Sequence, residues 1–378
     1  MGTSPGPHHP GTTSNVGGAA PTAVSTAEDA SAQLAEFERR LPEHHLAPLW
    51  KVLRTLTPRE PAPVAAPTRW RAPDWRGQLS AAGRLITASR AERRVLILEN
   101  AALPGESRIT TSLYAGVQLL LPGETAPSHR HAATALRFVF QGEGAYTTVD
   151  EDRIPMHPGD LVITPSWSFH EHGNDGAEPV LWLDGLDVPI VNTLAAAFSE
   201  EDARHPDTRG VRGPDARGLR GRSPQVGTPE ARRRRAMSSR DPAALTCFPY
   251  EQTCESLDTS RRKGPCDPHC GLRIAFTDDR GVSPMPTMGA AMQLLPAGFE
   301  GRRYRSTDGA VFAVLSGHGS IDVGGDVGGQ RWPLEPHDIV VIPSWTWYAL
   351  RADRDLTLFS FSDRPLQQHS SLWREQRG

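Results

Sequence analysis

Short apolar segments, separated by glycine, proline and other turn-forming residues, dominate the chain from about residue 93 onward. Before residue 200 these segments are VLIL, GVQLLL, LRFVF, AYTTV, DLVIT and PVLWLDGLDV. Runs of this length and spacing predict short β-strands arranged in a barrel or a sandwich. The same texture returns from about residue 288 to 362. The pattern therefore predicts a mostly β fold.

The preceding segment, residues 25–92, carries a different pattern. A capping-box sequence at 25–28 starts a first set of apolar residues at helical spacing, and a second set follows Pro42. These apolar residues are Leu34, Phe37, Leu41, Leu46, Leu49, Trp50 and Leu53. They predict two amphipathic helices, and the prolines between 58 and 73 predict a stiff, extended arm. Residues 1–24 contain almost no large apolar side chain and are expected to be disordered.

An internal repeat accounts for most of the remaining length. Residues 158–170, PGDLVITPSWSFH, match residues 336–348, PHDIVVIPSWTWY, at an offset of 178 positions (336 − 158). The segments QLLLPG and FQGEG find similar partners at an offset of 175 (293 − 118 and 315 − 140). Two copies of one β module are therefore expected, over residues 93–199 and 246–378.

The stretch between the copies, residues 200–245, is rich in arginine, proline and glycine and is predicted to be a connector. Four consecutive arginines at 232–235 raise the question of nucleic-acid binding. No aromatic residue is interleaved with them, and the whole chain of 378 residues has a net charge of −3. The run is therefore interpreted as a solvated surface segment, and no nucleic acid is expected as a partner.

The sequence also bears on cellular location. It contains no run of about 18 apolar residues, so no membrane span is expected. Its first residues lack a basic start followed by an apolar block, so no secretory signal is expected. Four cysteines in 378 residues do not make a disulfide scaffold. A soluble, cytoplasmic protein is predicted.

Two H-x-H sequences carry the candidate chemistry of the first copy, His129-Arg-His131 and His170-Glu-His172. Residues i and i+2 of a strand project to the same face, so both histidines of a pair can point into a barrel. Three imidazoles from two strands can bind one divalent metal and leave the open positions that a catalytic metal needs. The alternative is that each histidine is individually hydrogen-bonded. Two such pairs in strand-like contexts favour the metal.

A weaker metal candidate lies at Cys266, His269 and Cys270. A zinc site there needs a fourth ligand at a recognisable spacing, and Cys254 fits that need only loosely. Free thiols are therefore the preferred interpretation.

The sequence around the histidines resembles the two motifs of the cupin family. Residues 123–131, GETAPSHRH, resemble the first motif, and residues 159–174, GDLVITPSWSFHEHGN, resemble the second. Ala135 and Leu136 stand where cupins usually have a glutamate, and Trp167 replaces a glycine of the second motif. The resemblance therefore implies a metal held by three histidines, without a glutamate.

These departures and the flanking sequence are similar to one subgroup, the bicupin dioxygenases that cleave the rings of gentisate, salicylate and 1-hydroxy-2-naphthoate. The similarity runs from about residue 35 to 376. It implies two jelly-roll-like β-barrels with N-terminal helices, and one Fe(II) per chain on His129, His131 and His170. It further implies that dioxygen opens gentisate between carbons 1 and 2 to give maleylpyruvate, and that the chains form a homotetramer.

The second copy has lost the metal-binding set. Tyr304 and Ser306 stand where the first copy has His129 and His131, and Tyr348 replaces the third histidine. The second barrel is therefore expected to hold no iron and to serve packing and subunit contacts.

Substrate-binding residues are expected on the strands around the metal. Tyr114, Gly116 and Gln118 alternate along one strand and share a face, so Gly116 would leave room above the metal and Gln118 would bind the substrate carboxylate. Arg137 lies on another strand-like run, where an inward arginine needs a partner such as that carboxylate. Arg93 resembles the family's second pocket arginine.

His172 and Asp184 complete the expected catalytic set, together with Arg137 and Gln118. His172 would contact the substrate by binding its hydroxylate, and it would also act in proton transfer. Asp184 would orient either His172 or Arg137.

Other functions remain open at the level of sequence. Salicylate or 1-hydroxy-2-naphthoate would use the same iron, and Tyr114 favours gentisate because the salicylate-cleaving relatives tend to have tryptophan there. A non-catalytic cupin that binds an aromatic acid would be expected to carry an output domain, and none is visible. A cupin isomerase or decarboxylase usually keeps the glutamate that is missing here.

Overall fold

The computed structural model describes residues 27–149, 152–201, 225–226, 247–278, 280–325 and 329–378. The tail 1–24, the first two residues of the capping box and most of the connector 200–245 lie outside the described residues. The chain divides into an N-terminal unit that ends at Glu60 and a larger unit from Pro61 to Gly378. Among the described residues, no helix is both long and apolar enough to cross a membrane.

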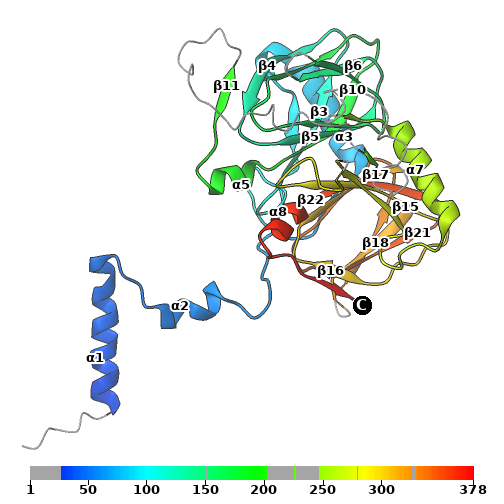
Figure 1. Cartoon of the computed structure of the whole chain (residues 1–378). Coiled ribbons are helices and arrows are strands. Elements are labelled where there is room, and N and C mark those ends of the chain that lie inside the picture. The colour runs from blue at the N-terminus through cyan, green and yellow to red at the C-terminus, as the bar shows by residue number, and fades with distance from the viewer. Residues whose placement is uncertain (1–26, 150–151, 202–224, 227–246, 279, 326–328) are drawn as a thin grey trace, which may run out of the picture. The chain divides into compact units, whose positions relative to one another are not determined.

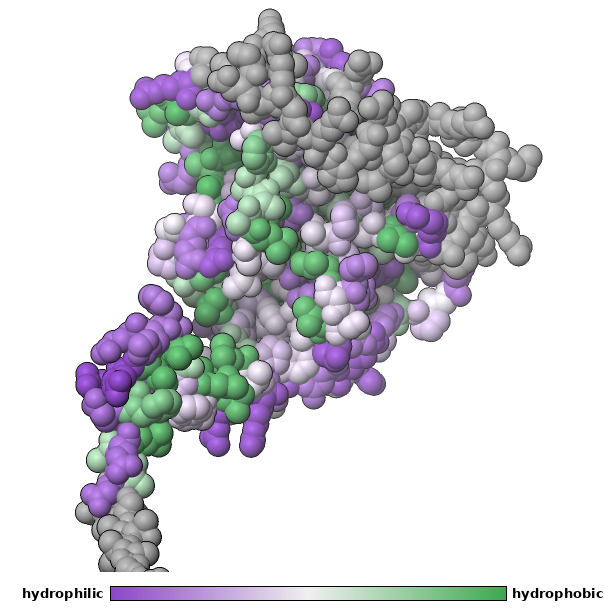
Figure 2. Space-filling model, turned by 60° about the vertical axis from the view of Figure 1, so that its left-hand side comes forward, coloured by the Kyte–Doolittle hydropathy of each residue, from purple (hydrophilic) through white to green (hydrophobic). Residues whose placement is uncertain are grey.

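The N-terminal unit contains both predicted amphipathic helices. Its elements are α1 Ala27–Arg40, a 3-10 turn at Leu41–His44, and α2 Leu49–Leu56. Trp50 of α2 donates a hydrogen bond from Nε1 to Glu38 of α1 (2.7 Å), which ties the helices together. The apolar side chains nevertheless stay exposed, with Phe37 at 52% and Trp50 at 60% of their full accessible surface. In Figure 2, green hydrophobic surface is visible on this segment, at the lower left of the view.

The first barrel consists of two antiparallel sheets that face each other (Figure 1). Its strands are β2 Val95–Ile97, β3 Tyr114–Leu120, β4 Thr125–His131, β5 Ala135–Gln141, β6 Ala145–Val149, β7 Asp152–Met156, β8 Leu161–Thr164, β9 His170–Asn174, β10 Val180–Leu186 and β11 Ser199–Glu201. One sheet has the order β8-β5-β10-β3-β2, and the other has the order β11-β4-β9-β6-β7. Strand β5 is buried on both faces, because Phe138 packs toward the second barrel while Arg137 and Val139 face the first barrel's interior.

The second barrel repeats this arrangement, as the internal repeat predicts. Its strands are β14 Leu272–Thr277, β15 Gly289–Leu295, β16 Tyr304–Ser306, β17 Ala310–Ser316, β18 Gly319–Val323, β19 Gln330–Leu334, β20 Ile339–Ile342, β21 Tyr348–Ala352, β22 Leu356–Ser362 and β23 Glu375–Arg377. The register repeats as well, since Tyr304 pairs with Tyr348 as His129 pairs with His170. The mostly β, bicupin fold with N-terminal helices is confirmed.

Helix α3, Ala72–Leu85, corrects the sequence prediction, which places Pro73 in the extended arm. Proline fits the first turn of a helix, where its missing N–H group would have no partner in any case. Trp75 and Leu79, four positions apart, are its large buried side chains, beside the buried Ala72, and this spacing is typical of one helix face. The other helices of the larger unit are α4 Ala88–Ala91, α5 Val188–Thr193, α7 Tyr250–Lys263 and α8 Arg364–His369.

Short strands are exchanged between the two halves of the larger unit. Strand β1, Thr68–Trp70, precedes the first barrel in sequence but pairs with β20 of the second. Strand β13, Cys247–Phe248, follows the connector and pairs with β8 of the first barrel. Strand β12, Gln225–Val226, lies within the connector and pairs with β14. Each barrel is therefore completed by residues from outside the range that the repeat assigns to it.

One core joins the barrels, and Phe138 and Phe359 stack at its centre with their ring centroids 4.1 Å apart. We expect Phe359→Ala to lower the free energy of unfolding by about 3–5 kcal/mol, because a fully buried aromatic side chain leaves a cavity. Urea denaturation followed by circular dichroism measures this loss. Phe198→Ala, at a half-exposed ring, is the matched control and should cost about 1 kcal/mol or less. Equal losses in the two variants would contradict a shared core at this position.

Candidate metal and substrate site

Three histidines meet at one end of the first barrel. His129 and His131 lie at the end of β4, and His170 begins β9 directly opposite His129. The candidate ligand atoms of these residues all lie within 4.8 Å of one another, and this is the cluster of metal-ligating side chains found among the described residues. Arg130 points the other way and donates to Glu200 of β11 (2.6 Å), as the alternation of a strand requires.

Backbone carbonyls fix the orientation of two of these rings. Nδ1 of His131 lies 2.7 Å from the carbonyl oxygen of Ala133, and Nδ1 of His170 lies 3.0 Å from that of Ser168. An Nδ1–H that donates to a carbonyl leaves Nε2 with the lone pair that binds a metal. Nε2 of His170 is buried without a hydrogen-bond partner among the described residues. The three side chains therefore fit a divalent metal ion.

His129 differs, because its Nδ1 is in contact with a guanidinium nitrogen of Arg93. The same nitrogen of Arg93 also donates to the carbonyl oxygen of Pro127 (2.7 Å). A neutral imidazole has one acceptor nitrogen, so a ring that accepts from Arg93 at Nδ1 carries its proton on Nε2. If His129 were to hold a metal through Nε2, its ring proton would have to lie on Nδ1, and Arg93 would then lose this acceptor.

The rings are held in the neutral form that metal binding needs. Burial, followed by the positive charge of Arg93, lowers the pKa of His129 to about 3. Burial also lowers the pKa of His131 to about 4, against the opposing effect of the Ala133 carbonyl. The pKa of His170 is lowered further, by burial and then by the charge of Arg137. No proton competes with a metal near neutral pH.

The lowered pKa values of the three histidines predict that the affinity of the protein for Co(II) stays nearly constant between pH 7.5 and 5.5. Three histidines with ordinary pKa values near 6.5 would lose about a thousandfold in affinity over that range, because each must release a proton. The pKa values here are depressed, so the competing protons bind only as the pH falls toward about 4. Visible absorption during Co(II) titration of the metal-free protein measures this, and a thousandfold decline would contradict neutral ligands.

A cavity of about 710 Å³ opens over the histidines. It brings together nine of the ten residues expected at the site: Arg93, Tyr114, Gln118, His129, His131, Arg137, His170, His172 and Asp184. Gly116 lies behind this wall. A Cβ there would stand 2.5 Å from Val95 Cγ1 and 3.0 Å from the hydroxyl oxygen of Tyr114, so the glycine makes room for these two side chains.

Arg137 and Asp184 form a buried ion pair on neighbouring strands, with 3.6 Å between Arg137 Nε and Asp184 Oδ1. Arg137 also donates to the Thr164 hydroxyl (2.6 Å), and Trp182 Nε1 donates to Asp184 (3.0 Å). Burial raises the pKa of Asp184 to about 6, although the charge of Arg137 opposes this, and burial lowers the pKa of Arg137 to about 10. Asp184 was expected to orient either His172 or Arg137, and in the structure its ion-pair partner is Arg137.

His172 is oriented instead by Thr147, whose hydroxyl oxygen lies 2.9 Å from Nδ1. The same hydroxyl donates to the sulfur of Met156 (3.0 Å), so it accepts from the Nδ1–H of His172. This arrangement leaves Nε2 of His172 with the lone pair. Burial, and then the charge of Arg137, holds the pKa of His172 well below its usual range. Sequence reasoning missed Thr147, since a threonine in a strand carries no distinguishing signal.

Gln118 presents an unsatisfied donor at the cavity. Its side chain is buried, and Nε2 makes no hydrogen bond with any described residue. The sequence also gave no sign of the cavity's outer wall, which a loop and helix α5 supply. Those residues are Glu106, Ser107, Arg108, Val188, Pro189, Asn192 and Thr193. They reach the site only through the folding of the chain, so no local pattern marks them.

The weaker metal candidate gains no support. Cys254, Cys266 and Cys270 are free thiols, and the described residues around them contain no group of three ligands near one another.

Comparisons with known proteins agree with this geometry. Residues 116–187 match the cupin domain family. The chain is 42% identical to gentisate 1,2-dioxygenase 1 of Aquipseudomonas alcaligenes over 90% of this chain and 96% of that protein. It is 35% identical to a gentisate 1,2-dioxygenase of a Streptomyces species over 88% of this chain and 92% of that protein.

A solved structure resembles the whole fold. Salicylate 1,2-dioxygenase of Pseudoaminobacter salicylatoxidans, determined with gentisate, aligns with a TM-score of 0.76 at 30% identity, over 91% of this chain and 94% of that one. Similarity of this extent spans most of the chain. The chain therefore belongs to the gentisate 1,2-dioxygenase family of cupin proteins, and it is a ring-cleaving dioxygenase.

Proposed function

We propose that this enzyme cleaves gentisate between carbons 1 and 2 and inserts both atoms of dioxygen to give maleylpyruvate. The observation that carries the proposal is a three-histidine cluster that shares one cavity with the buried arginine Arg137. An acid whose carboxylate and neighbouring hydroxyl approach the metal would place its negative charge beside that arginine. The relatives named for gentisate support this choice of substrate.

The cofactor proposed is one Fe(II) per chain, held in the first barrel by His129, His131 and His170. When bound, iron brings the aromatic acid and dioxygen to one centre and overcomes the spin barrier to their reaction. Three neutral ligands leave the positions that both reactants need. If His129 held the metal through Nε2, its Nδ1 would carry the proton, and Arg93 would then be available to the substrate.

The remaining side chains position the acid and its protons. Arg137 binds the carboxylate, and Asp184 holds the guanidinium in place (3.6 Å). Gln118 offers its unsatisfied Nε2–H to the same carboxylate. His172 takes the proton of the substrate hydroxyl on Nε2, because Thr147 fixes its other proton on Nδ1.

Tyr114 bears on the choice between gentisate and salicylate. Its hydroxyl lies over Gly116 and faces the cavity wall, where burial raises its pKa and keeps it protonated. A protonated phenol can donate to the second hydroxyl of gentisate, which salicylate lacks. We expect Tyr114→Phe to lower kcat/KM for gentisate by about tenfold, the effect of one lost hydrogen bond, and to leave salicylate nearly unchanged. Steady-state kinetics with both acids measures this, and equal losses would contradict a selective contact.

The proposed activity is tested by anaerobic loading with Fe(II), followed by an aerobic assay for the near-ultraviolet absorbance of the ring-opened product. Gentisate, salicylate and 1-hydroxy-2-naphthoate are run side by side. Fastest turnover of gentisate supports the proposal, and a preference for either other acid replaces the substrate. Failure of iron-loaded protein to turn over any of the three would favour a non-catalytic cupin that binds an aromatic acid.

We further propose that residues 93–199 carry catalysis, that the barrel of 246–378 holds no iron, and that the chains form a homo-oligomer, a tetramer by family resemblance. The exposed apolar side chains of α1 and α2 support an oligomer, since such surface on a folded unit marks contact sites. A cytoplasmic location stays a prediction.

A further inference from the structure

The second barrel has a cavity of its own, about 160 Å³ in volume. Tyr304 and Tyr348 lie in its wall as cross-strand partners, at the positions of two metal-binding histidines in the first barrel. Their ring centroids are 5.8 Å apart, and Phe312 lies 5.6 Å from Tyr348. The place of the lost metal site is therefore taken by an aromatic wall around a space that the side chains do not fill.

Arg273 is the unpaired cation of this cavity. It lies opposite Gln293 in the β14–β15 pair, so both side chains share the cavity face. Leu272 and Ile274 point to the other face, into the core between the barrels. Arg273 makes no hydrogen bond or ion pair with any residue in the described part of the chain. The side chain of Arg273 is exposed, so it is open to a ligand that enters the cavity, and its pKa is lowered by desolvation and then by the charge of Arg364.

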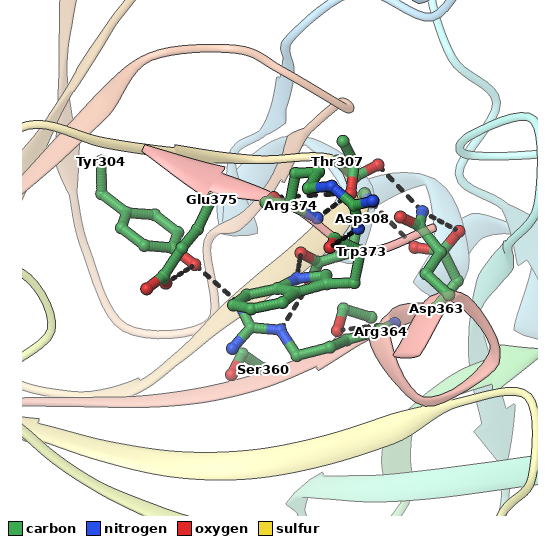
Figure 3. Close-up of polar contacts among 12 residues, drawn as sticks. Tyr304, Thr307, Asp308, Ser360, Asp363, Arg364, Trp373, Arg374 and Glu375 are labelled. Atoms are coloured by element: carbon green, nitrogen blue, oxygen red, sulfur yellow. Dashed lines mark hydrogen bonds and ion pairs between the residues drawn. The ribbon is translucent and has the colours of Figure 1, made fainter. Parts of the chain in front are cut away.

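The carboxylates in the same wall already have their own donors (Figure 3). Asp308 accepts from Nε of Arg364 (3.2 Å) and from Nε1 of Trp373 (2.8 Å). Glu375 accepts from the Tyr304 hydroxyl (3.0 Å), which in turn accepts from Arg364 (3.0 Å). This network pairs Arg364 and leaves the exposed Arg273 without a carboxylate partner among the described residues.

His269 supplies a second group without a partner. Its side chain is 8% exposed, and neither ring nitrogen makes a hydrogen bond with a described residue. The nearest carboxylate oxygen, Oδ1 of Asp267, is 3.5 Å from Nδ1 and outside hydrogen-bond geometry. The ring stands edge-on to Tyr304, with 6.2 Å between centroids. Leaving a buried N–H unsatisfied costs free energy that an acceptor in the cavity would recover.

We propose that the second barrel binds a small aromatic carboxylate without a metal. Its carboxylate pairs with Arg273 and accepts from His269, and its ring lies against Tyr304, Tyr348 and Phe312. A cavity of about 150 Å³ can hold benzene, so the size suits one ring with one short substituent. The site does not depend on iron or on the proposed reaction.

Equilibrium dialysis of the full-length, iron-loaded protein with benzoate tests this site. Two equivalents should bind to the wild-type chain, one should remain in Arg137→Gln, and the other should remain in Arg273→Gln. Arg331→Gln removes an exposed arginine that is paired with Asp322, and should keep both equivalents. As many equivalents of benzoate in Arg273→Gln as in the wild-type chain would overturn the proposal.

Two further measurements sharpen the result. Arg273→Lys keeps the charge but not the bidentate fork, so the second equivalent should bind about tenfold more weakly, and unchanged affinity would overturn the role of Arg273 even if Arg273→Gln fails to fold. Acetate should displace benzoate from this site only at much higher concentration, and equal competition would overturn the aromatic assignment. Gentisate turnover enters neither readout, so the failure of this proposal is distinguishable from the failure of the proposed activity.

Discussion

Under the proposed function, we expect the replacement of His170 by alanine to abolish iron binding and, with it, the cleavage of gentisate. His170 is one of the three histidines that cluster among the described residues and that are proposed to hold the iron, and its Nε2 is buried without a described partner. Loss of an outer-shell partner alone costs about 10–100-fold in metal affinity or activity, so loss of a ligand should exceed about a hundredfold. Iron content after gel filtration measures the loss of iron binding, and an assay of gentisate turnover measures the loss of activity.

The matched control is His318→Ala in the second barrel. His318 is exposed and contacts Glu335 (2.6 Å), far from the cluster in sequence and on no strand that supplies a ligand. This variant should keep full iron content and full turnover. If His170→Ala kept one iron per chain, the ligand set would have to be assigned anew.

The second large effect is expected for Arg137→Gln, which lowers kcat/KM for gentisate by about 10²–10³. The variant loses a charge-assisted contact with the substrate carboxylate and also leaves Asp184 buried without its counterion. The charge of Arg137 lowers the pKa of Asp184, so its removal lets that pKa rise above about 6. The carboxyl group then takes up a proton near neutral pH, and urea denaturation should show a lower free energy of unfolding.

A second substitution separates substrate binding from stability. In Arg137→Gln/Asp184→Asn no buried charge remains, so stability should recover while activity does not. Arg153→Gln, at an exposed arginine of the same barrel, serves as the control and should change neither. Recovery of activity in the double variant would show that Arg137 acts only by supporting the fold.

Local sequence patterns predicted the parts of this molecule that depend on alternation and repetition. The i, i+2 spacing placed His129 and His131 on one face, and the repeat aligned Tyr304 and Tyr348 with ligand positions before any register was known. Patterns failed where long-range contacts decide the outcome. The partner of His172, for example, comes from Thr147 on β6, across a pair that only the sheet order reveals.

The partner of Asp184 also could not be predicted from local sequence patterns. Parity placed it on the cavity face but could not choose between His172 and Arg137 as its partner, because both lie on strands whose register was unknown. The structure resolves this through the pairing of β10 with β5, which sets Asp184 directly opposite Arg137. Loop residues such as Arg108 have no periodic signal at all, and their place in the cavity wall follows only from the completed fold.

The exchanged strands have a consequence for the order in which a ribosome can finish this protein. Thr68 of β1 pairs with Val341 of β20, which is synthesised 273 residues later (341 − 68). At a translation rate of about 5–20 residues per second, strand β1 remains unpaired for roughly 15–55 s before β20 has been synthesised. The first barrel likewise lacks β13 until Phe248 has emerged. Nascent chains should therefore stay sensitive to protease, and dependent on chaperones, at least until Val341 has emerged from the ribosome.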